Sequence, residues 1–461
     1  MRSNICLLFL LPPFLSAAQS QPDWKAILAR LDRLEDQNRQ LVTEIRALRE
    51  QLTAEAARSV DASATPPPAT PAPTAAAAEP AGAEADERLS VQESRTAELS
   101  QSKIEADHRL PVTLTGMLLF NAFLNGKENG GQPNTTIASL TPGTQTGGAT
   151  LRQTVLGLKF HGPEIAGGGT VSGTLYMDFF GGAGTSLNQL MRLRVATLDL
   201  NWKHTTVSFG QDKPIITPRE PDSLAQVGVS PLTGSGNLWL WQPQARVEQR
   251  FDFGEQAGLR AQLGVFETAE SSTGVPAAYS STLASARPGY EGRFEFWKKR
   301  GNWRFEVAPA FHASSSHLLG QSVPSRVYSV DWLLRPLASL DITGIFFGGE
   351  NVDVLGGLHQ GITILNSDEP LAVHAYGGWA QLAWRATPRL TLHVFGGRQV
   401  DRNSDLIAGD IAWNQTLAAN AFFQLSSNVL ASFEASQVRT VYLTGGTRLN
   451  PHYDLALAYL F

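Results

Sequence analysis

Cysteine and charged residues are scarce in this chain of 461 residues, and long apolar runs are missing from most of it. The only cysteine is Cys6, near the N-terminus, so the sequence predicts no disulfide, no zinc–thiolate site and no cysteine nucleophile. After residue 18 no stretch of about 20 apolar residues occurs, which excludes transmembrane helices. The 9 histidines show no metal-ligand spacing, and we expect no metal, no cofactor and no enzymatic activity.

The overall balance of residue types suits a large β-rich chain. Glycine is abundant, with 42 residues, aromatic residues make up 9% of the chain, and charged residues only 17%. The net charge of −5 is modest, so it neither favours nor excludes an anionic partner. We expect no nucleic-acid partner. A mean hydropathy of −0.13 is too low for a helical membrane protein and fits a barrel with a polar interior.

The first residues have the features of a secretory signal. Arg2 precedes an apolar run from Ile5 to Leu15, and Ser16-Ala17-Ala18 provides a small-residue cleavage site. We therefore predict a signal peptide over residues 1–18 and export of the remaining chain.

A heptad pattern occupies residues 22–54. Its apolar positions step by three and four, and Trp24 occupies the first a position. The other core positions are Ile27, Leu31, Leu34, Asn38, Leu41, Ile45, Leu48 and Leu52. About four heptads predict an oligomerising coiled coil, in which Asn38 fixes the register at a cost in stability. A lone amphipathic helix packed on the barrel is the alternative, and the spacing alone leaves dimer and trimer both open.

Residues 55–108 are predicted to form a linker. Alanine, proline, threonine and glutamate dominate its first part, a composition that buries little apolar surface and gives an extended, semi-rigid spacer. Charged residues between Ser90 and His108 suggest a short helix before the next domain.

From residue 109 to residue 461 the apolar pattern changes to a period of two. The last nine residues show it most clearly, with Tyr453, Leu455, Leu457, Tyr459 and Phe461 on one face of a strand. Apolar side chains between two aromatic ends suit a strand that crosses a bilayer. A terminal phenylalanine on such a row is similar to the assembly signal of Gram-negative outer-membrane barrels.

The fold class expected from this pattern is all-β, a transmembrane antiparallel barrel of about 16 strands. The expected strands span residues 110–124, 150–161, 170–180, 190–202, 204–211, 241–252, 258–269, 288–298, 302–312, 325–335, 339–349, 373–385, 389–399, 411–425, 428–440 and 449–461. Short and long connections alternate between them, as in outer-membrane barrels. The N-terminal coil is then expected in the periplasm.

The third long connection, Asp212 to Leu240, has four prolines and several glycines. This composition predicts irregular backbone packed against a wall. In general porins of 16 strands the corresponding loop folds into the lumen, and Trp239 and Trp241 argue for an anchor at its far end. A disordered surface loop is the alternative.

Five arginines are predicted to face the lumen. Residues two or four apart on a strand share a face, so Arg192 shares a face with Arg194, and Arg246 shares one with Arg250. Arg152 joins them from the second strand. A lipid-facing arginine would cost about 2–4 kcal/mol at the middle of the membrane. The arginines would thus form a basic ladder able to hold carboxylate or phosphate oxygens.

Three acids are expected on the same lumen surface, namely Asp178, Glu248 and Glu434. Acids opposite arginines give a transverse field that orients a dipolar solute. The alternative is that these charges neutralise one another and brace a polar lumen, without contacting solutes.

Several segments together resemble the DcaP-type porins. They are Leu151–Phe160, Tyr176–Gly181, Met191–Ala196, Phe209–Asp212, Gly377–Leu382 and Phe433–Tyr442. The sequence departs from the family at Val155, where the family tends to have arginine, and at Val195-Ala196-Thr197, which replaces a His-Ala-Tyr-like run. Both changes remove polar groups, so the solute is expected to differ.

The resemblance implies a homotrimeric outer-membrane channel for dicarboxylate-like anions with an N-terminal periplasmic coiled coil. Such a barrel would contact membrane lipid and lipopolysaccharide. A phosphate-type anion-selective porin is an alternative. A further alternative is a tether from the outer membrane to the cell wall through the N-terminal region, with the channel secondary.

Overall fold

The computed structural model of the protein describes residues 111–182, 189–268, 275, 277–284, 287–358, 360–364 and 369–461. The chain divides into two compact units, Met1–Ser90 and Val91–Phe461, and every described residue belongs to the second. The predicted signal peptide, coiled coil and linker lie outside the described residues and stay predictions. Helices in the described part are the 3-10 segments η2 (Ala277–Thr282), η3 (Val352–Leu355) and η4 (Asn403–Asp405). Within that part, no helix has the length and apolar character needed to span a membrane.

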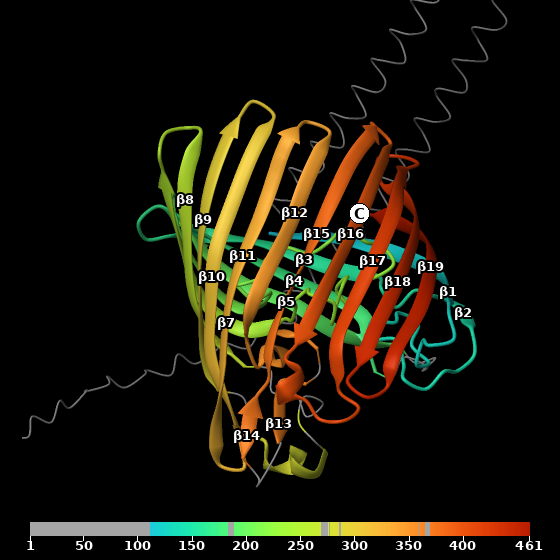
Figure 1. The fold of residues 1–461 in the computed structure, drawn as a ribbon. Coiled ribbons are helices and arrows are strands. Elements are labelled where there is room, and N and C mark those ends of the chain that lie inside the picture. The colour runs from blue at the N-terminus through green and yellow to red at the C-terminus, as the bar shows by residue number, and fades with distance from the viewer. Residues whose placement is uncertain are drawn as a thin grey trace, which may run out of the picture. The chain divides into compact units, whose positions relative to one another are not determined.

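Sixteen strand positions form one closed antiparallel wall (Figure 1). The wall strands are β1 (Val112–Asn125), β3 (Val155–Ile165), β4 (Gly169–Gly181), β5 (Leu190–Asn201), β6 (Thr205–Asp212), β7 (Gln242–Asp252), β8 (Ala257–Glu267), β9 (Pro288–Arg300), β10 (Trp303–Leu318), β11 (Gln321–Leu337), β12 (Leu340–Glu350), β15 (His374–Thr387), β16 (Leu390–Asp401), β17 (Ile411–Gln424), β18 (Val429–Tyr442) and β19 (Gly446–Leu460). Each pairs with the next, and β1 closes the ring on β19 from Met117↔Leu460 to Asn125↔His452. The predicted antiparallel barrel of about 16 strands is confirmed.

One wall position is built from two strands. The short strand β2 (Thr146–Thr150) pairs with the second half of β1, and β3 pairs with its first half. The two lie end to end, and residues 151–154 between them interrupt the ladder. The sheet of 17 strands therefore has sixteen positions around the ring.

Residues alternate between an apolar outer face and a polar interior along the strands. In β19 the outward Leu455 is 58% exposed, whereas the neighbouring Asp454 is 2% exposed and Ala456 is 2% exposed. On the inner side several polar side chains are fully buried, including Asn121 and Gln399. The alternation read from the last nine residues thus places apolar side chains outside and polar ones within, the pattern of a membrane-spanning barrel.

The two ends of the barrel differ in their connections. At one end the turns are short, for example residues 338–339 and 388–389; at the other, the connections hold η2, η3, η4, β13 (Ile362–Ile364) and β14 (Pro370–Ala372). Strands β13 and β14 lie below the wall in Figure 1, at the long-connection end.

One connection at the long-connection end is unexpectedly tight. Strands β10 and β11 extend through residues predicted as a loop and pair up to Leu318↔Gln321. Leu319 and Gly320 have φ angles of 55° and 74°, the two positive values of a type I′ hairpin turn. A leucine rarely adopts a positive φ, and Leu319 stands where this turn type usually has asparagine. The sequence therefore did not predict the turn.

Candidate functional site in the barrel lumen

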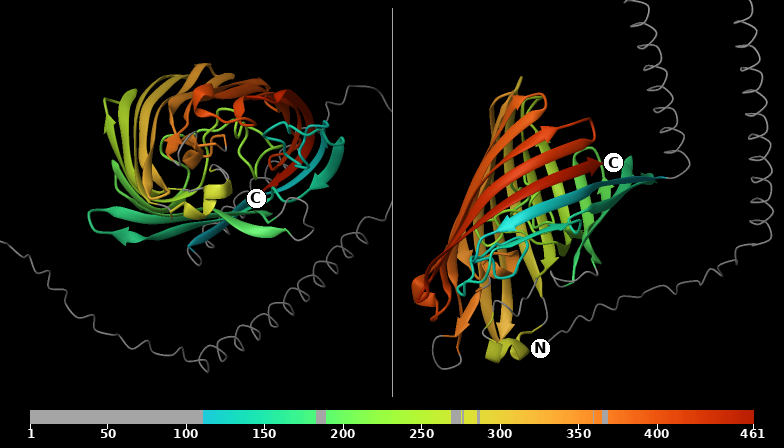
Figure 2. Two further views of the ribbon diagram at one scale, coloured as in Figure 1. Left: turned by 60° about the horizontal axis from the view of Figure 1, so that its bottom comes forward. Right: turned by 90° about the vertical axis from the view of Figure 1, so that its right-hand side faces the viewer.

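The connection between β6 and β7, residues 213–241, lies inside the barrel and is called loop 3 below. Figure 2 shows it within the ring of strands. Its backbone contacts the far wall: the Asn121 amide of β1 donates to the Leu224 carbonyl at 2.8 Å. The Asp222 N–H donates to the side-chain oxygen of Gln381 in β15 at 2.7 Å. Loop 3 therefore crosses the interior, as expected from the corresponding loop of general porins.

Apolar side chains of loop 3 dock into separate patches of the inner wall. Ile216, Leu224, Leu232 and Leu238 are all buried. Ile216 and Leu238 join one cluster with Phe347, and Leu232 packs with Trp379, Phe395 and other wall residues. Since burying one such side chain is worth about 1.5–3 kcal/mol, these anchors hold much of the loop.

A close backbone approach fixes the middle of loop 3. Gly236 has a φ of +96°, and a Cβ placed there would lie 2.3 Å from the carbonyl oxygen of Gly378 in β15. Only glycine combines this conformation with this proximity. Gly397 of β16 likewise has no room for a side chain, because its Cβ would lie 2.2 Å from the Ser235 carbonyl oxygen.

Arg219 links loop 3 to the wall through three carboxylates. Its Nε lies 2.8 Å from Asp331 Oδ1, and its Nη2 contacts Glu306 and lies 3.4 Å from Glu295 Oε2. Burial alone would lower the pKa of the Arg219 guanidinium, but Asp331 and Glu306 outweigh it and raise that pKa. The first half of loop 3 is thus held by an ionic contact as well as by apolar anchors.

A second ion pair lies within loop 3. Lys213 Nζ is 2.6 Å from Glu220 Oε1, and the Ser230 hydroxyl donates to Glu220 Oε2 at 2.7 Å. Burial opposes ionisation of Glu220, but Lys213, the Ser230 hydrogen bond and Arg194 together hold the pKa of this carboxyl below its usual value. Glu220 is therefore ionised at neutral pH.

Four of the five predicted arginines face the lumen and have carboxylate partners. Asp178 accepts from Arg192 at 3.2 Å and 2.7 Å in a bidentate pair, and lies 3.7 Å from Arg194. The remaining contacts are Arg246 to Asp212 at 2.8 Å and Arg250 to Glu248 at 2.7 Å. Both arginines of β5 also lie over the ring of Trp241, at 5.0 Å for Arg192 and 4.7 Å for Arg194.

Arg152 and Glu434 occupy more enclosed positions. Arg152 is 5% exposed; its guanidinium lies 4.5 Å above the Phe180 ring and donates to the Phe180 and Gly181 carbonyls at 3.2 Å. Glu434 is 3% exposed and accepts hydrogen bonds from Ser223 of loop 3 at 2.6 Å and from Asn420 at 3.0 Å. Glu434 thus anchors loop 3 to β18.

Sequence reasoning missed four arginines of the same network: Arg219, Arg260, Arg293 and Arg304. The last three lie on β8, β9 and β10, where they alternate with outward apolar residues. Arg293 is fully buried, and its Nε lies 2.7 Å from Asp331 Oδ2. The alternation along these strands could have identified the three wall arginines: in β9, for example, Arg293 and Glu295 flank the outward Phe294. Arg219 had no such signal, because a loop has no periodicity.

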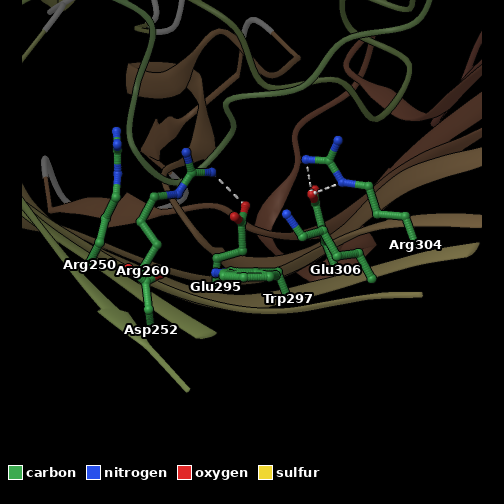
Figure 3. Close-up of a pocket in the computed structure, with 8 residues that line it drawn as sticks. Arg250, Asp252, Arg260, Glu295, Trp297, Arg304 and Glu306 are labelled. Carbon is green, nitrogen blue, oxygen red and sulfur yellow. Dashed lines mark hydrogen bonds and ion pairs between the residues drawn. The ribbon is translucent and has the colours of Figure 1, made fainter. Parts of the chain in front are cut away.

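The network opens into a cavity at the short-turn end of the lumen, with a volume of about 350 Å³. The residues around it are Arg250, Asp252, Arg260, Glu295, Trp297, Lys299, Arg304 and Glu306. Figure 3 shows Arg250, Arg260 and Glu295 projecting to the same side of the strands, with Arg260 bonded to Glu295 at 2.6 Å. Arg304 contacts Glu306 in the same way.

The arginines and acids of this network are not equally accessible. The side chains of Arg250 and Arg304 are 54% and 50% exposed, whereas those of their partners Glu248 and Glu306 are 12% and 3% exposed. Arg192 likewise shields a fully buried Asp178. In these three pairs the carboxylates therefore lie behind the guanidinium groups. Two acids remain accessible: the side chain of Asp252, in the same cavity, is 50% exposed, and that of Asp222, on loop 3, is 59% exposed.

Comparisons with known proteins bear on the fold. The sequence matches no protein-family model and no curated protein. Among solved structures, the chain is similar to the outer membrane channel DcaP of Acinetobacter baumannii, with a TM-score of 0.63 and 15% identity over 76% of this chain and 97% of that one. It is also similar to an anion-selective porin from Comamonas acidovorans, with a TM-score of 0.53 and 13% identity over 76% and 99%. The described part of the chain therefore has the sixteen-stranded fold of outer-membrane channels, the fold that its resemblance to DcaP-type porins predicts.

Proposed function

We propose that the protein is an outer-membrane porin that lets small hydrophilic solutes diffuse passively and favours anions such as dicarboxylates. The observation that carries this proposal is the arrangement of charge in the lumen. In the pairs of Arg192, Arg250 and Arg304 the guanidinium group stands in front of a more buried carboxylate, so a solute beside these pairs meets positive charge first. A channel selects ions by groups that replace part of their hydration shell.

Arg250 and Arg304 are the proposed first contacts of an anion at the short-turn end. Half of each side chain is exposed, and each guanidinium has donors left beyond its one carboxylate partner. Since the planar fork matches a carboxylate, two such groups on one wall suit a solute with two carboxylates. Arg192 and Arg194 would act deeper, where loop 3 narrows the passage.

A phosphate-type anion-selective porin is the second candidate, because the same guanidinium forks hold phosphate oxygens. The similar Comamonas porin is described as anion-selective, which supports anion preference without choosing between the two solutes. Of the charges predicted from the sequence, Arg152 and Glu434 are proposed to brace the lumen rather than contact solutes, because both are almost completely buried.

The remaining features of the proposal rest on the sequence. The coiled coil of residues 22–54 would join three chains in the periplasm, with residues 55–108 as linker. Contact of this region with the cell wall is a proposed secondary role. Deleting residues 22–90 from the full chain tests both: loss of trimers with unchanged conductance per barrel supports oligomerisation, and detachment of the membrane from the wall supports tethering.

The test of the solute uses the purified protein in planar bilayers. Succinate and inorganic phosphate are added separately while the chloride current is recorded. We expect succinate to reduce the current at lower concentration than phosphate does, and the effect to weaken in the double variant Arg250→Gln/Arg304→Gln. Arg389→Gln, in an exposed turn, removes one charge outside the lumen as a control. Stronger block by phosphate would favour the second candidate, and block by neither would refute the selective site.

A further inference from the structure

Three polar side chains lie side by side on the outer face of the barrel, near the long-connection end. Arg398 of β16 pairs with Gln415 of β17, and Gln415 pairs with Arg439 of β18. Adjacent residues on the same strands are fully buried on the lumen side: Gln399, Asn414 and Thr440. By alternation the three polar side chains point outward, and the two arginine Cα atoms are about 10 Å apart, two strand spacings.

Among the residues that the structure describes, the two outward arginines have no ionic partner. Within the described ranges, no carboxylate lies within ion-pair distance of Arg398 or Arg439, and Arg398 lies 4.0 Å from the ring centroid of Trp413. By contrast, the outward Arg326 of β11 lies 3.7 Å from Glu350. Uncompensated positive charge facing lipid is unfavourable unless it lies at the membrane interface and meets an anion.

A groove on the same outer face begins at Arg398. It has a volume of about 450 Å³ and runs across β11, β12, β15 and β16. Its walls include Trp332, Phe346 and Tyr376, and Gly378 and Gly396 leave its floor without side chains. A Cβ at Gly378 would lie 2.3 Å from a backbone oxygen of β12, so this hollow is built into the sheet.

We propose that this face binds a phosphate-bearing lipid of the leaflet at the long-connection end, a phosphorylated glycolipid of the lipid A kind. Arg398 and Arg439 hold the phosphate, because guanidinium groups bind its oxygens through paired N–H donors, and Gln415 lies between them as a further donor. Trp413 marks the interfacial level. One acyl chain occupies the apolar groove. The inference rests on the proposed location of the barrel in an outer membrane.

The test measures lipid binding to the full-length protein in detergent micelles. Lipid A and its phosphate-free derivative are titrated against wild type, Arg398→Gln/Arg439→Gln and Arg326→Gln. We expect the double variant to lose affinity for lipid A by at least tenfold, and Arg326→Gln to bind as wild type does. The phosphate-free lipid should bind all three proteins equally. Equal affinity of the double variant and wild type for lipid A, or an equal loss for both lipids, would overturn the proposal.

Channel recordings of the same variants separate this inference from the proposed function. The two arginines face away from the lumen, so the double variant should keep the wild-type conductance and ion preference. If the wild-type protein binds lipid A as predicted but conducts no ions, the channel proposal is refuted and the lipid site is still supported. Heat-dependent gel mobility shows that each variant is folded, so a weaker affinity reports on the site itself.

Discussion

Arg219→Gln tests how loop 3 is held across the lumen. The substitution removes the cation that contacts Asp331, Glu306 and Glu295. Breaking a buried ion pair costs about 3–5 kcal/mol. Arg219 is 19% exposed, and its partners keep other arginines, so we expect about 2–3 kcal/mol, in the range of one or two hydrogen bonds to a charged group.

The loss should be local. Loop 3 keeps the buried side chains of Ile216, Leu224, Leu232 and Leu238, each worth about 1.5–3 kcal/mol, so it should stay inside the barrel while its first half fluctuates. Single-channel recordings should show larger current noise and brief openings to higher conductance. The unfolding midpoint, followed by heat-dependent gel mobility, should fall.

Arg304→Gln is the matched control for this prediction. Arg304 also contacts Glu306, but it belongs to the wall strand β10 and its side chain is 50% exposed. It should leave the noise and the midpoint close to wild type. If Arg219→Gln behaves like this control, the ionic contact does not hold loop 3 and the reasoning fails.

Three further predictions follow from the same geometry. Gly236→Val should displace loop 3 and raise the conductance. Gly254→Val, at a similar positive φ but with open space around it, should destabilise the fold without raising the conductance. Equal conductance of the two variants would count against the docking of loop 3 on the wall at Gly236. Asp331→Asn should lower the free energy of unfolding by about 3–5 kcal/mol, because it leaves the fully buried Arg293 short of a partner; an unchanged urea midpoint would contradict this. The pKa of Glu220 is lowered in the folded protein, so ionised Glu220 stabilises the fold fully above about pH 4.5, and this stabilisation is lost as the pH falls through the lowered pKa. The unfolding midpoints of wild type and Glu220→Gln should therefore differ at pH 7 and converge in acid.

Much of the fold was readable because a barrel strand imposes a strict period of two. Outward residues such as Leu455 must be apolar and inward ones such as Asp454 need not be, so the alternation identifies each strand in the sequence. The hairpin at Leu319 and Gly320 escaped this reading. The last residues of β10 before the turn, Ser314 to His317, are polar on both faces of the strand, so the alternation is lost there. The turn itself has no signature residue at its first position.

The candidate site was readable only in part. The arginines of β5 and β7 were assigned to the lumen by spacing, and the structure places them there. Which carboxylate each one meets depends on the register between strands, as for Arg192 and Asp178 on β5 and β4. Arg219 meets residues up to 112 positions away, a contact that only the path of loop 3 determines.

The central claim is that exposed guanidinium groups in front of buried carboxylates make this lumen favour anions. The most direct measurement is the reversal potential of the purified wild-type channel in a gradient of potassium chloride at neutral pH. The account predicts a reversal potential whose sign indicates preference for chloride over potassium. The magnitude of this potential should be smaller in the double variant Arg250→Gln/Arg304→Gln. A potential of the sign for potassium preference would contradict it.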